Sequence, residues 1–292
     1  MIYISTGGFN SEECIKAVHK LVEQGIFDIE LSGGKYEVNQ IQKLKYEKKI
    51  INSLNLQIHN YFPPPPNPFV FNLGSLDKEI SKKSIKHALS SIELAASLNS
   101  KYYSFHAGFL LDPQVYELGK KIKKRATYNR KESKKFFIER VNKLAEFAEN
   151  RNIKLLVENN VLSYNNLLEF KENILLMVDE AECLEIMNQL SNNVKMLVDV
   201  AHLKVSSNSL NFDKISFLKK LDKWIFAYHL SENDGKKDSN KKISLNSWFW
   251  PHLKKDLDYY SIEVYGEKPE ELLKQKELTQ NMIYNSVIKN KN

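Results

Sequence analysis

The stretches Leu155-Leu156-Val157-Glu158-Asn159 and Met196-Leu197-Val198-Asp199 each run through apolar residues and reach a carboxylate at or next to their end. Such short, continuous apolar runs are typical of strands buried on both faces, as in parallel sheets. A carboxylate at the end of a buried strand is costly unless it is paired, hydrogen-bonded or bound to a metal ion. The two stretches therefore predict a parallel sheet whose strand ends carry a polar site.

Short apolar runs of this kind occur eight times along the 292 residues and alternate with helical patterns. We predict strands at Ile2–Ser5, Phe27–Leu31, Leu56–Asn60, Tyr102–His106, Lys154–Asn159, Val194–Asp199, Trp224–His229 and Tyr259–Val264. We predict helices at Ser11–Gln24 (with Ser11 as N-cap), Val38–Ser53, Asp77–Leu98, Ser133–Asn150, Asn173–Leu190, Asp213–Lys220 and Pro269–Lys289, and a weaker one within Trp248–Leu257. This alternation indicates parallel strands joined by crossover helices.

Eight strand–helix units close a barrel, and a TIM barrel needs roughly 250 residues. We therefore predict a single (β/α)₈ TIM-barrel domain over residues 1–292. An open, doubly wound sheet is the alternative, but no glycine-rich dinucleotide-binding loop follows the first strand, where Gly7-Gly8 stands alone. The two long connections, Tyr61–Ser75 and Gly108–Glu132, follow strands three and four, on the side where barrel enzymes build their sites.

The composition is that of a globular protein, with 42% hydrophobic and 27% charged residues and a net charge of +7. The excess of lysine indicates either a solvated surface or attraction to phosphate. Cys14 and Cys183 are far apart and form no CxxC pair, so we expect buried thiols. The N-terminus lacks the pattern of a signal peptide, and no apolar stretch approaches the roughly 20 residues that span a bilayer. We therefore expect a cytoplasmic protein that does not associate with a membrane.

Ionisable side chains lie at the ends of six successive predicted strands. They are His59, His106, Glu158, Asp199, His229 and Glu263 on strands three to eight, and Glu30 lies within strand two. The ends of barrel strands converge on one mouth, so we expect these side chains to share one site. Carboxylates together with imidazoles suit Mg²⁺, Mn²⁺, Co²⁺ or Zn²⁺.

We predict that four of these residues bind a divalent metal ion, because they come from four neighbouring strands. They are Glu158, Asp199, His229 and Glu263. His202 follows Asp199 by three residues and can face the same cavity from the loop after strand six. We expect His59, His106 and His202 to bind a second metal ion or to line the substrate pocket.

Glu158, the Asp199-x-x-His202 unit, His229 and Glu263 resemble the strand-end pattern of the xylose isomerase-like TIM barrels. The resemblance extends over essentially the whole chain, because all eight strands take part. This superfamily includes sugar epimerases, hydroxypyruvate isomerase-type enzymes, inosose dehydratases and AP endonuclease family 2. The resemblance implies a metal-dependent isomerase or epimerase that acts on a sugar, sugar acid or sugar phosphate, and it is compatible with a homodimer.

Such an enzyme transfers a proton next to a carbonyl group through an enediolate that the metal ion stabilises. In the sugar epimerases of the superfamily, the glutamates of strands five and eight act as base and acid, and the resemblance assigns these roles to Glu158 and Glu263. Lys236 and Lys237, in the loop after strand seven, are candidates for binding a substrate phosphate or carboxylate. The alternative interpretation of both is a pair of solvated loop lysines.

Two other reactions are compatible with these residues. A phosphodiesterase of the endonuclease branch would use His59, His106 and His202, but the Asp-x-His that completes its metal site reads Asp238-Ser239-Asn240 here. An amide is a poor ligand for a transition metal, so nucleic acid is not the expected partner. A sugar dehydratase would use the same metal and would expel a hydroxide.

Overall fold

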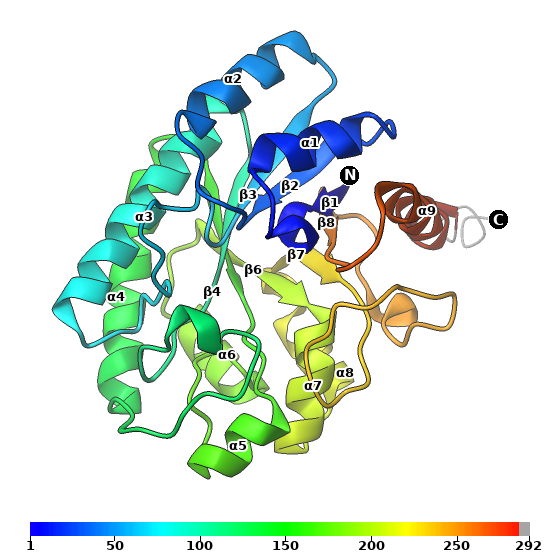
Figure 1. Ribbon diagram of the computed structural model, residues 1–292. Coiled ribbons are helices and arrows are strands. Elements are labelled where there is room, and N and C mark those ends of the chain that lie inside the picture. Colours follow the sequence, from blue (N-terminus) through cyan, green and yellow to red (C-terminus); the bar gives the residue numbers. More distant parts are fainter. Residues whose placement is uncertain (286–292) are drawn as a thin grey trace.

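Eight parallel strands close into a barrel in a computed structural model that describes residues 1–285 (Figure 1). The strands follow one another around the barrel in sequence order, and the last strand pairs with the first. They are β1 (Ile2–Ser5), β2 (Asp28–Ser32), β3 (Asn55–His59), β4 (Tyr102–His106), β5 (Lys154–Glu158), β6 (Val194–Asp199), β7 (Ile225–Leu230) and β8 (Tyr259–Ile262). The predicted (β/α)₈ TIM barrel is confirmed, and each strand lies within two residues of its predicted bounds.

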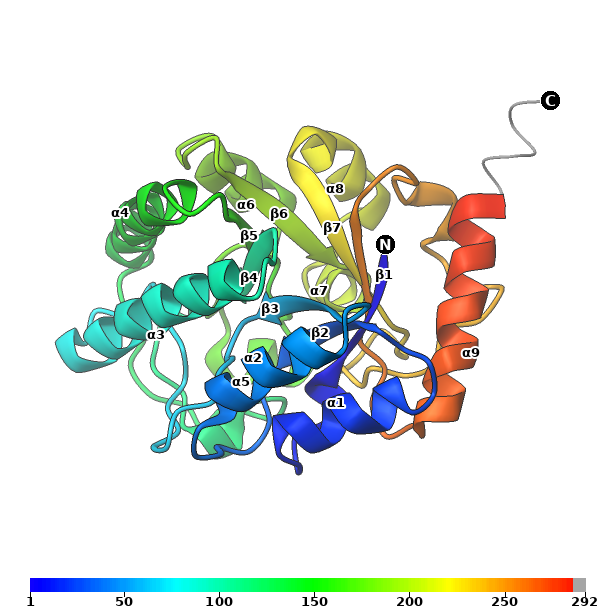
Figure 2. The same cartoon turned by 90° about the horizontal axis from the view of Figure 1, so that it is seen from above.

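The helices surround the barrel, as the view from above shows (Figure 2). They are α1 (Cys14–Val22), α2 (Gln40–Ile50), α3 (Lys78–Ser97), α4 (Arg130–Glu149), α5 (Tyr164–Phe170), α6 (Glu180–Met187), α7 (Val200–Leu210), α8 (Lys214–Leu221) and α9 (Pro269–Gln280). The interior of the barrel holds a separate cluster of side chains from alternate strand positions. Its members are Tyr3, Tyr102, Leu156, Leu197, Ala227 and Tyr259. The interior is therefore packed.

Helix α7 corrects the interpretation of His202 as a loop residue. Asp199 ends β6 and is also the N-cap of α7, because its Oδ1 accepts from the backbone N–H groups of Ala201 and His202. Because the strand passes into the helix with no intervening loop, the sequence offers no turn signal there. His202 consequently lies in the first turn of α7, where the helix fixes its position.

Several other helix predictions were wrong in extent. Helix α1 begins at Cys14 after Glu13, so Ser11 is not its N-cap. The predicted helix Asn173–Leu190 is reduced to α6, because the backbone before Asp179 bonds to the β4–α4 connection instead: Leu110 donates to Ile174, and Leu176 donates to Gly108. Helix α5, which the pattern missed, lies in the same β5–β6 connection.

Two predicted helices of the C-terminal third also differ in extent from those in the structure. Within Trp248–Leu257 only the short 3₁₀ turn Trp250–His252 forms. The last helix begins at Pro269 as predicted, and a π-helical turn continues α9 over Asn281–Asn285. The remainder of the predicted segment up to Lys289 lies outside the described residues. Within residues 1–285, no helix is long and apolar enough to cross a bilayer.

The long β3–α3 connection folds back over α3. His87 of α3 is buried beneath it, with its ring stacked on Tyr61 and edge-on to Phe69 and Phe71. Asn72 joins this connection to the next one, because its side-chain amide donates to the carbonyl oxygens of Phe109 and Leu111. The two connections thus form a joined wall beside the mouth of the barrel.

Candidate metal centre

Strand register brings the predicted ligands together at one end of the barrel. His106 of β4 is the register partner of Glu158 of β5, and Asp199 of β6 is that of His229 of β7. Glu263 directly follows β8, and its backbone N–H donates to Leu230 at the end of β7. Neighbouring parallel strands therefore present these side chains at similar heights.

Three carboxylates converge around the Nδ1 atom of His229. This atom lies 3.3 Å from Oε2 of Glu263, 3.4 Å from Oε1 of Glu158 and 4.0 Å from Oδ2 of Asp199. One ligand atom from each of the four lies within 4.8 Å of the others, and all four residues are buried. The four residues that the sequence grouped as metal ligands therefore do form one cluster, which we call the mouth cluster.

Three residues of the mouth cluster carry buried atoms that lack hydrogen-bond partners. Among the described residues, both carboxylate oxygens of Glu158, Oδ2 of Asp199 and Nδ1 of His229 are buried with no such partner. A buried, unpaired carboxylate is costly, and a bound cation removes that cost. Three carboxylates and one imidazole are ligands that Mg²⁺, Mn²⁺, Co²⁺ and Zn²⁺ accept, so the residues fit a divalent ion.

Asp199 both caps helix α7 and belongs to the mouth cluster. Its Oδ1 caps α7, and its backbone pairs with the side-chain amide of Asn159, which donates to the Asp199 carbonyl and accepts from the Asp199 N–H. These bonds hold the carboxylate in one orientation and leave Oδ2 at 3.7 Å from Nε2 of His202 and 4.0 Å from Nδ1 of His229. The orientation of this candidate ligand is therefore set before any ion binds.

A second group of imidazoles surrounds the same glutamate. Nε2 of His59 and Nδ1 of His106 each lie 3.4 Å from Oε2 of Glu158, whereas His229 faces Oε1. His59, His106 and Glu158 could themselves hold a metal ion. Glu158 thus lies between two candidate positions, with one oxygen directed at each.

His202 approaches from α7. Its Nδ1 lies 3.1 Å from the carbonyl oxygen of Asn159 and 3.3 Å from Oε1 of Glu158. Its Nε2 lies 3.2 Å from Oδ2 of Asp238, which comes from the β7–β8 connection. Asp238 belongs to Asp238-Ser239-Asn240, the segment that corresponds to the Asp-x-His of the endonuclease branch. Its contact with His202 links the β7–β8 connection to the mouth of the barrel. Asn240, also buried, has a left-handed backbone with φ 40°.

The mouth holds more carboxylates than positive charges. Burial acts to raise the pKa of Glu158, but the fields of His106 and His229 outweigh it and hold the pKa well below the ordinary value. Burial raises the pKa of Asp199 to about 7, with Glu158 and Asp238 acting in the same direction. For His229 the effect of burial is outweighed by Glu30, Glu158 and Glu263, which raise its pKa. A divalent cation would neutralise the excess negative charge.

Three side chains that the sequence did not single out as ligands support the cluster. Glu30 is fully buried, and its Oε2 lies 2.8 Å from Nε2 of His229. The hydroxyl of Tyr259 donates to the same oxygen, and that of Tyr265 donates to Glu263. The available signal for Glu30 was an ionisable residue between the apolar Ile29 and Leu31 inside a predicted strand, whereas the tyrosines resemble ordinary core residues.

Lys236 and Lys237 lie exposed in the β7–β8 connection. Their backbone N–H groups donate to the side chain of Asp234. Within residues 1–285, neither ammonium group contacts the mouth cluster, so their predicted role in binding substrate stays a prediction.

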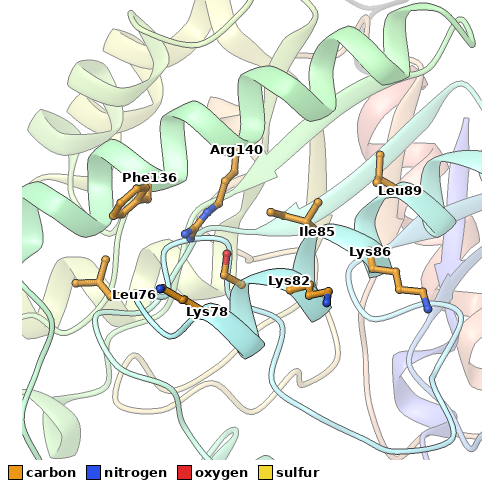
Figure 3. A pocket seen from close by; sticks show the side chains of 9 residues that line it. Leu76, Lys78, Lys82, Ile85, Lys86, Leu89, Phe136 and Arg140 are labelled. Atoms are coloured by element: carbon orange, nitrogen blue, oxygen red, sulfur yellow. The ribbon is translucent and has the colours of Figure 1, made fainter.

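The outer wall of the barrel carries a cavity of about 580 Å³ between α3 and α4 (Figure 3). Its lining consists of four apolar side chains, four basic ones and a serine: Leu76, Ile85, Leu89, Phe136, Lys78, Lys82, Lys86, Arg140 and Ser81. It shares no residue with the mouth cluster. These four basic side chains therefore lie on an outer face, away from the candidate metal centre.

Sequence comparison assigns the family. A model of the xylose isomerase-like TIM barrel matches residues 18–259. The chain belongs to this family. No match was found to a curated protein sequence.

Several solved structures have the same fold and align with this member of the xylose isomerase-like family over nearly its whole length. A D-tagatose 3-epimerase-like protein has a TM-score of 0.73 at 19% identity, over 99% of this chain and 98% of that one. An L-ribulose 3-epimerase has a TM-score of 0.64 at 15% identity, over 99% and 93%. A 3-keto-D-glucoside 4-epimerase from E. coli has a TM-score of 0.64 at 14% identity, over 95% and 97%.

Proposed function

We propose that this protein is a divalent-metal-dependent isomerase or epimerase of a sugar or sugar acid. The observation that carries the proposal is the mouth cluster, in which ligand atoms of Glu158, Asp199, His229 and Glu263 lie within 4.8 Å of one another and the first three residues carry buried atoms with no hydrogen-bond partner. The fold shared with three proteins named as sugar epimerases or epimerase-like supports the choice of reaction. Fold alone does not fix function, so the site carries the argument.

The reaction requires the removal of a proton from a carbon next to a carbonyl group. A divalent ion held by the mouth cluster would supply Lewis-acid stabilisation of the negative charge that develops on the substrate oxygen. Glu158 and Glu263 are the proposed proton-transfer groups, and in the cluster their carboxylate oxygens lie 3.4 Å and 3.3 Å from Nδ1 of His229. In the proposed reaction these two carboxylates act as base and acid on opposite faces of the substrate.

Glu263 is suited to a proton-transfer role because its two oxygens have different surroundings. Oε2 faces His229, whereas Oε1 accepts a hydrogen bond from the hydroxyl of Tyr265. This bond fixes the plane of the carboxylate and favours its charged form. Lys236 and Lys237 would meet a phosphate or carboxylate of the substrate from the β7–β8 connection.

The proposal is tested by metal analysis followed by isotope exchange. The protein is purified without chelator or metal-affinity resin, its metal content is measured, and ketopentoses, ketohexoses and keto acids are incubated with it and Mn²⁺ in D₂O. We expect about one ion per chain and deuterium at the carbon next to the carbonyl. Glu158→Gln should lose the ion, and the matched control Glu182→Gln, which changes a buried carboxylate paired with Arg130, should keep it.

The absence of bound metal even after incubation with Mn²⁺ would overturn the proposal. Retained exchange in a Glu263→Gln variant that still binds metal would remove that glutamate from proton transfer. Either result is interpretable only if the variant melts as cooperatively as the parent protein, so thermal unfolding is measured in parallel.

A second candidate function is a metal-dependent phosphodiesterase. The observation that favours it is the arrangement of His59 and His106 around Oε2 of Glu158, which would allow this glutamate to bridge two ions. Paired metal ions suit phosphodiester hydrolysis. Two or three zinc ions per chain, together with cleavage of DNA that contains an abasic site, would establish this function in place of the isomerase.

A further inference from the structure

We propose that Glu30 is a positioning residue that fixes the His229 ring so that its Nδ1 atom faces the mouth cluster. This inference rests on the proposed metal site and extends it to a residue in the interior of the barrel. Glu30 lies on β2, whereas the four mouth-cluster residues come from β5 to β8 and the residue after it. Its carboxylate reaches His229 of β7, so the contact joins two strands that are not neighbours in the barrel.

The contact is short and fully buried. Oε2 of Glu30 lies 2.8 Å from Nε2 of His229, and neither residue has exposed surface. The hydroxyl of Tyr259 donates to the same oxygen. The Tyr259 ring is itself held between Tyr102, on which it stacks, and Tyr3, which it meets edge-on. The position of the Glu30 carboxylate is thus fixed from below by packed aromatic side chains.

The contact determines which nitrogen of His229 can bind a metal ion. A neutral imidazole carries its proton on one nitrogen only, and a carboxylate at Nε2 keeps the proton there as an Nε2–H donor. Nδ1 then keeps its lone pair, and Nδ1 is the atom that lies 3.3 to 4.0 Å from the three carboxylates. Carboxylates that orient a metal-binding histidine in this way raise its basicity as a ligand.

A different interpretation is that Glu30, His59 and His229 hold an ion themselves, since these three also lie close together. The distance argues against it. Two atoms bound to one ion at 2.0–2.2 Å lie about 3.0 to 3.4 Å apart, depending on the geometry. The 2.8 Å between Glu30 and His229 is shorter and matches a direct hydrogen bond. We therefore assign Glu30 to orientation and not to coordination.

The test measures zinc binding and the state of the His229 ring in the same proteins. Zn²⁺ affinity is determined by competition with a chelator, and ¹⁵N-histidine spectra of the zinc-loaded protein report which nitrogen binds and which carries the proton. The His229 signal is identified by its loss in His229→Gln. The set comprises the parent protein, Glu30→Gln, Glu30→Ala and the control Glu117→Gln, which alters a buried carboxylate paired with Arg125.

We expect the parent protein to bind Zn²⁺ through Nδ1 of His229, with the proton on Nε2. Glu30→Ala should lose about 10- to 100-fold in affinity, the range found when such supporting carboxylates are removed. Glu30→Gln should recover part of this loss, because its amide oxygen can still accept the Nε2–H bond. It should also shift the Nε2 resonance, and Glu117→Gln should change neither quantity. If Glu30→Ala does not fold, Glu30→Gln carries the test through the same resonance.

Two unfavourable outcomes are distinguishable. Zinc bound with parental affinity through Nδ1 in Glu30→Ala would overturn the positioning role and leave the metal site standing. A parent protein that binds no Zn²⁺, or binds it without any change at His229, would overturn the proposed metal site and this inference with it.

Discussion

The hydroxyl of Tyr265 lies 2.7 Å from Oε1 of Glu263, and its ring rests against Gly7 in the turn after β1. A Cβ atom at Gly7 would lie 2.7 Å from that hydroxyl oxygen, closer than side chains approach one another. The absence of a side chain at residue 7 therefore leaves room for the tyrosine that supports a proposed catalytic carboxylate. The turn after β1 and the residues after β8 are neighbours in the closed barrel, which brings these residues together.

Gly7→Ala should displace Tyr265 and weaken its bond to Glu263. A hydrogen bond to a charged group contributes roughly 1.5–3 kcal/mol, so we expect isomerase turnover to fall about tenfold or more. Tyr265→Phe removes the hydroxyl without crowding and should give a similar loss. Steady-state rates and metal content are measured for both. Parental turnover in Tyr265→Phe would show that this hydroxyl does not assist Glu263.

Metal affinity should rise with pH through neutrality. The pKa of Asp199 in the metal-free protein is raised to about 7 by burial and by Glu158, so below this pH a proton competes with the ion. The raised pKa of His229 adds a second proton that the ion must displace. Affinity should therefore increase by about tenfold per pH unit for each proton displaced. Calorimetric titration with Mn²⁺ in two buffers of different ionisation enthalpy counts the protons, and an affinity that stays constant from pH 6 to pH 8 would contradict this expectation.

His87 should make the fold sensitive to acid. Burial among aromatic rings lowers its pKa to about 4, below the ordinary 6.5 of the unfolded chain. As the pH falls from 6.5 towards 4, the unfolded chain gains a proton that the folded protein does not, so the fold loses up to about 3 kcal/mol. His87→Phe cannot bind this proton.

As the pH falls from 6.5 towards 4, the parent protein should therefore lose more free energy of unfolding than His87→Phe does. Urea unfolding at several pH values measures it. Carboxylates that titrate in the same range are common to both proteins and cancel in the difference. A difference that does not vary with pH would show that His87 takes up its proton equally readily in the folded and the unfolded state.

His106→Gln should separate the one-ion and two-ion interpretations of the mouth. His106 contacts Oε2 of Glu158 and takes no part in the mouth cluster, so under the isomerase proposal about one ion per chain should remain. Under the phosphodiesterase alternative, the content should fall by one ion from two or three. Elemental analysis of the two proteins prepared side by side provides the measurement.

The strand ends could be predicted from the sequence because ionisable side chains, which are costly to bury unpaired, recur at the ends of six successive predicted strands. That signal identified Glu158, Asp199, His229 and Glu263, and the structure brings them together. The roles of these residues in catalysis and metal binding stay predictions. Asp238 could be placed only by the fold, because the course of the β7–β8 connection determines its distance from His202.

Other features lacked a sequence signal for physical reasons. Helix α7 follows β6 without a turn, so no glycine or proline marked its start. Helix α5 has only seven residues, too few for a periodic pattern to stand out. The segment before α6 has helical composition, yet it pairs with the β4–α4 connection through backbone bonds that only the tertiary structure provides.

Asp199 has a consequence for anyone who wishes to redesign this protein. One of its oxygens begins α7 and the other faces the mouth cluster, so a replacement chosen for new chemistry would also remove the cap of a helix. Loss of an N-cap typically costs about 1 kcal/mol. Asn keeps the cap, which leaves it as the conservative exchange at this position. Engineering of specificity should therefore begin with side chains of the surrounding connections, whose exchange leaves the ends of the barrel helices intact.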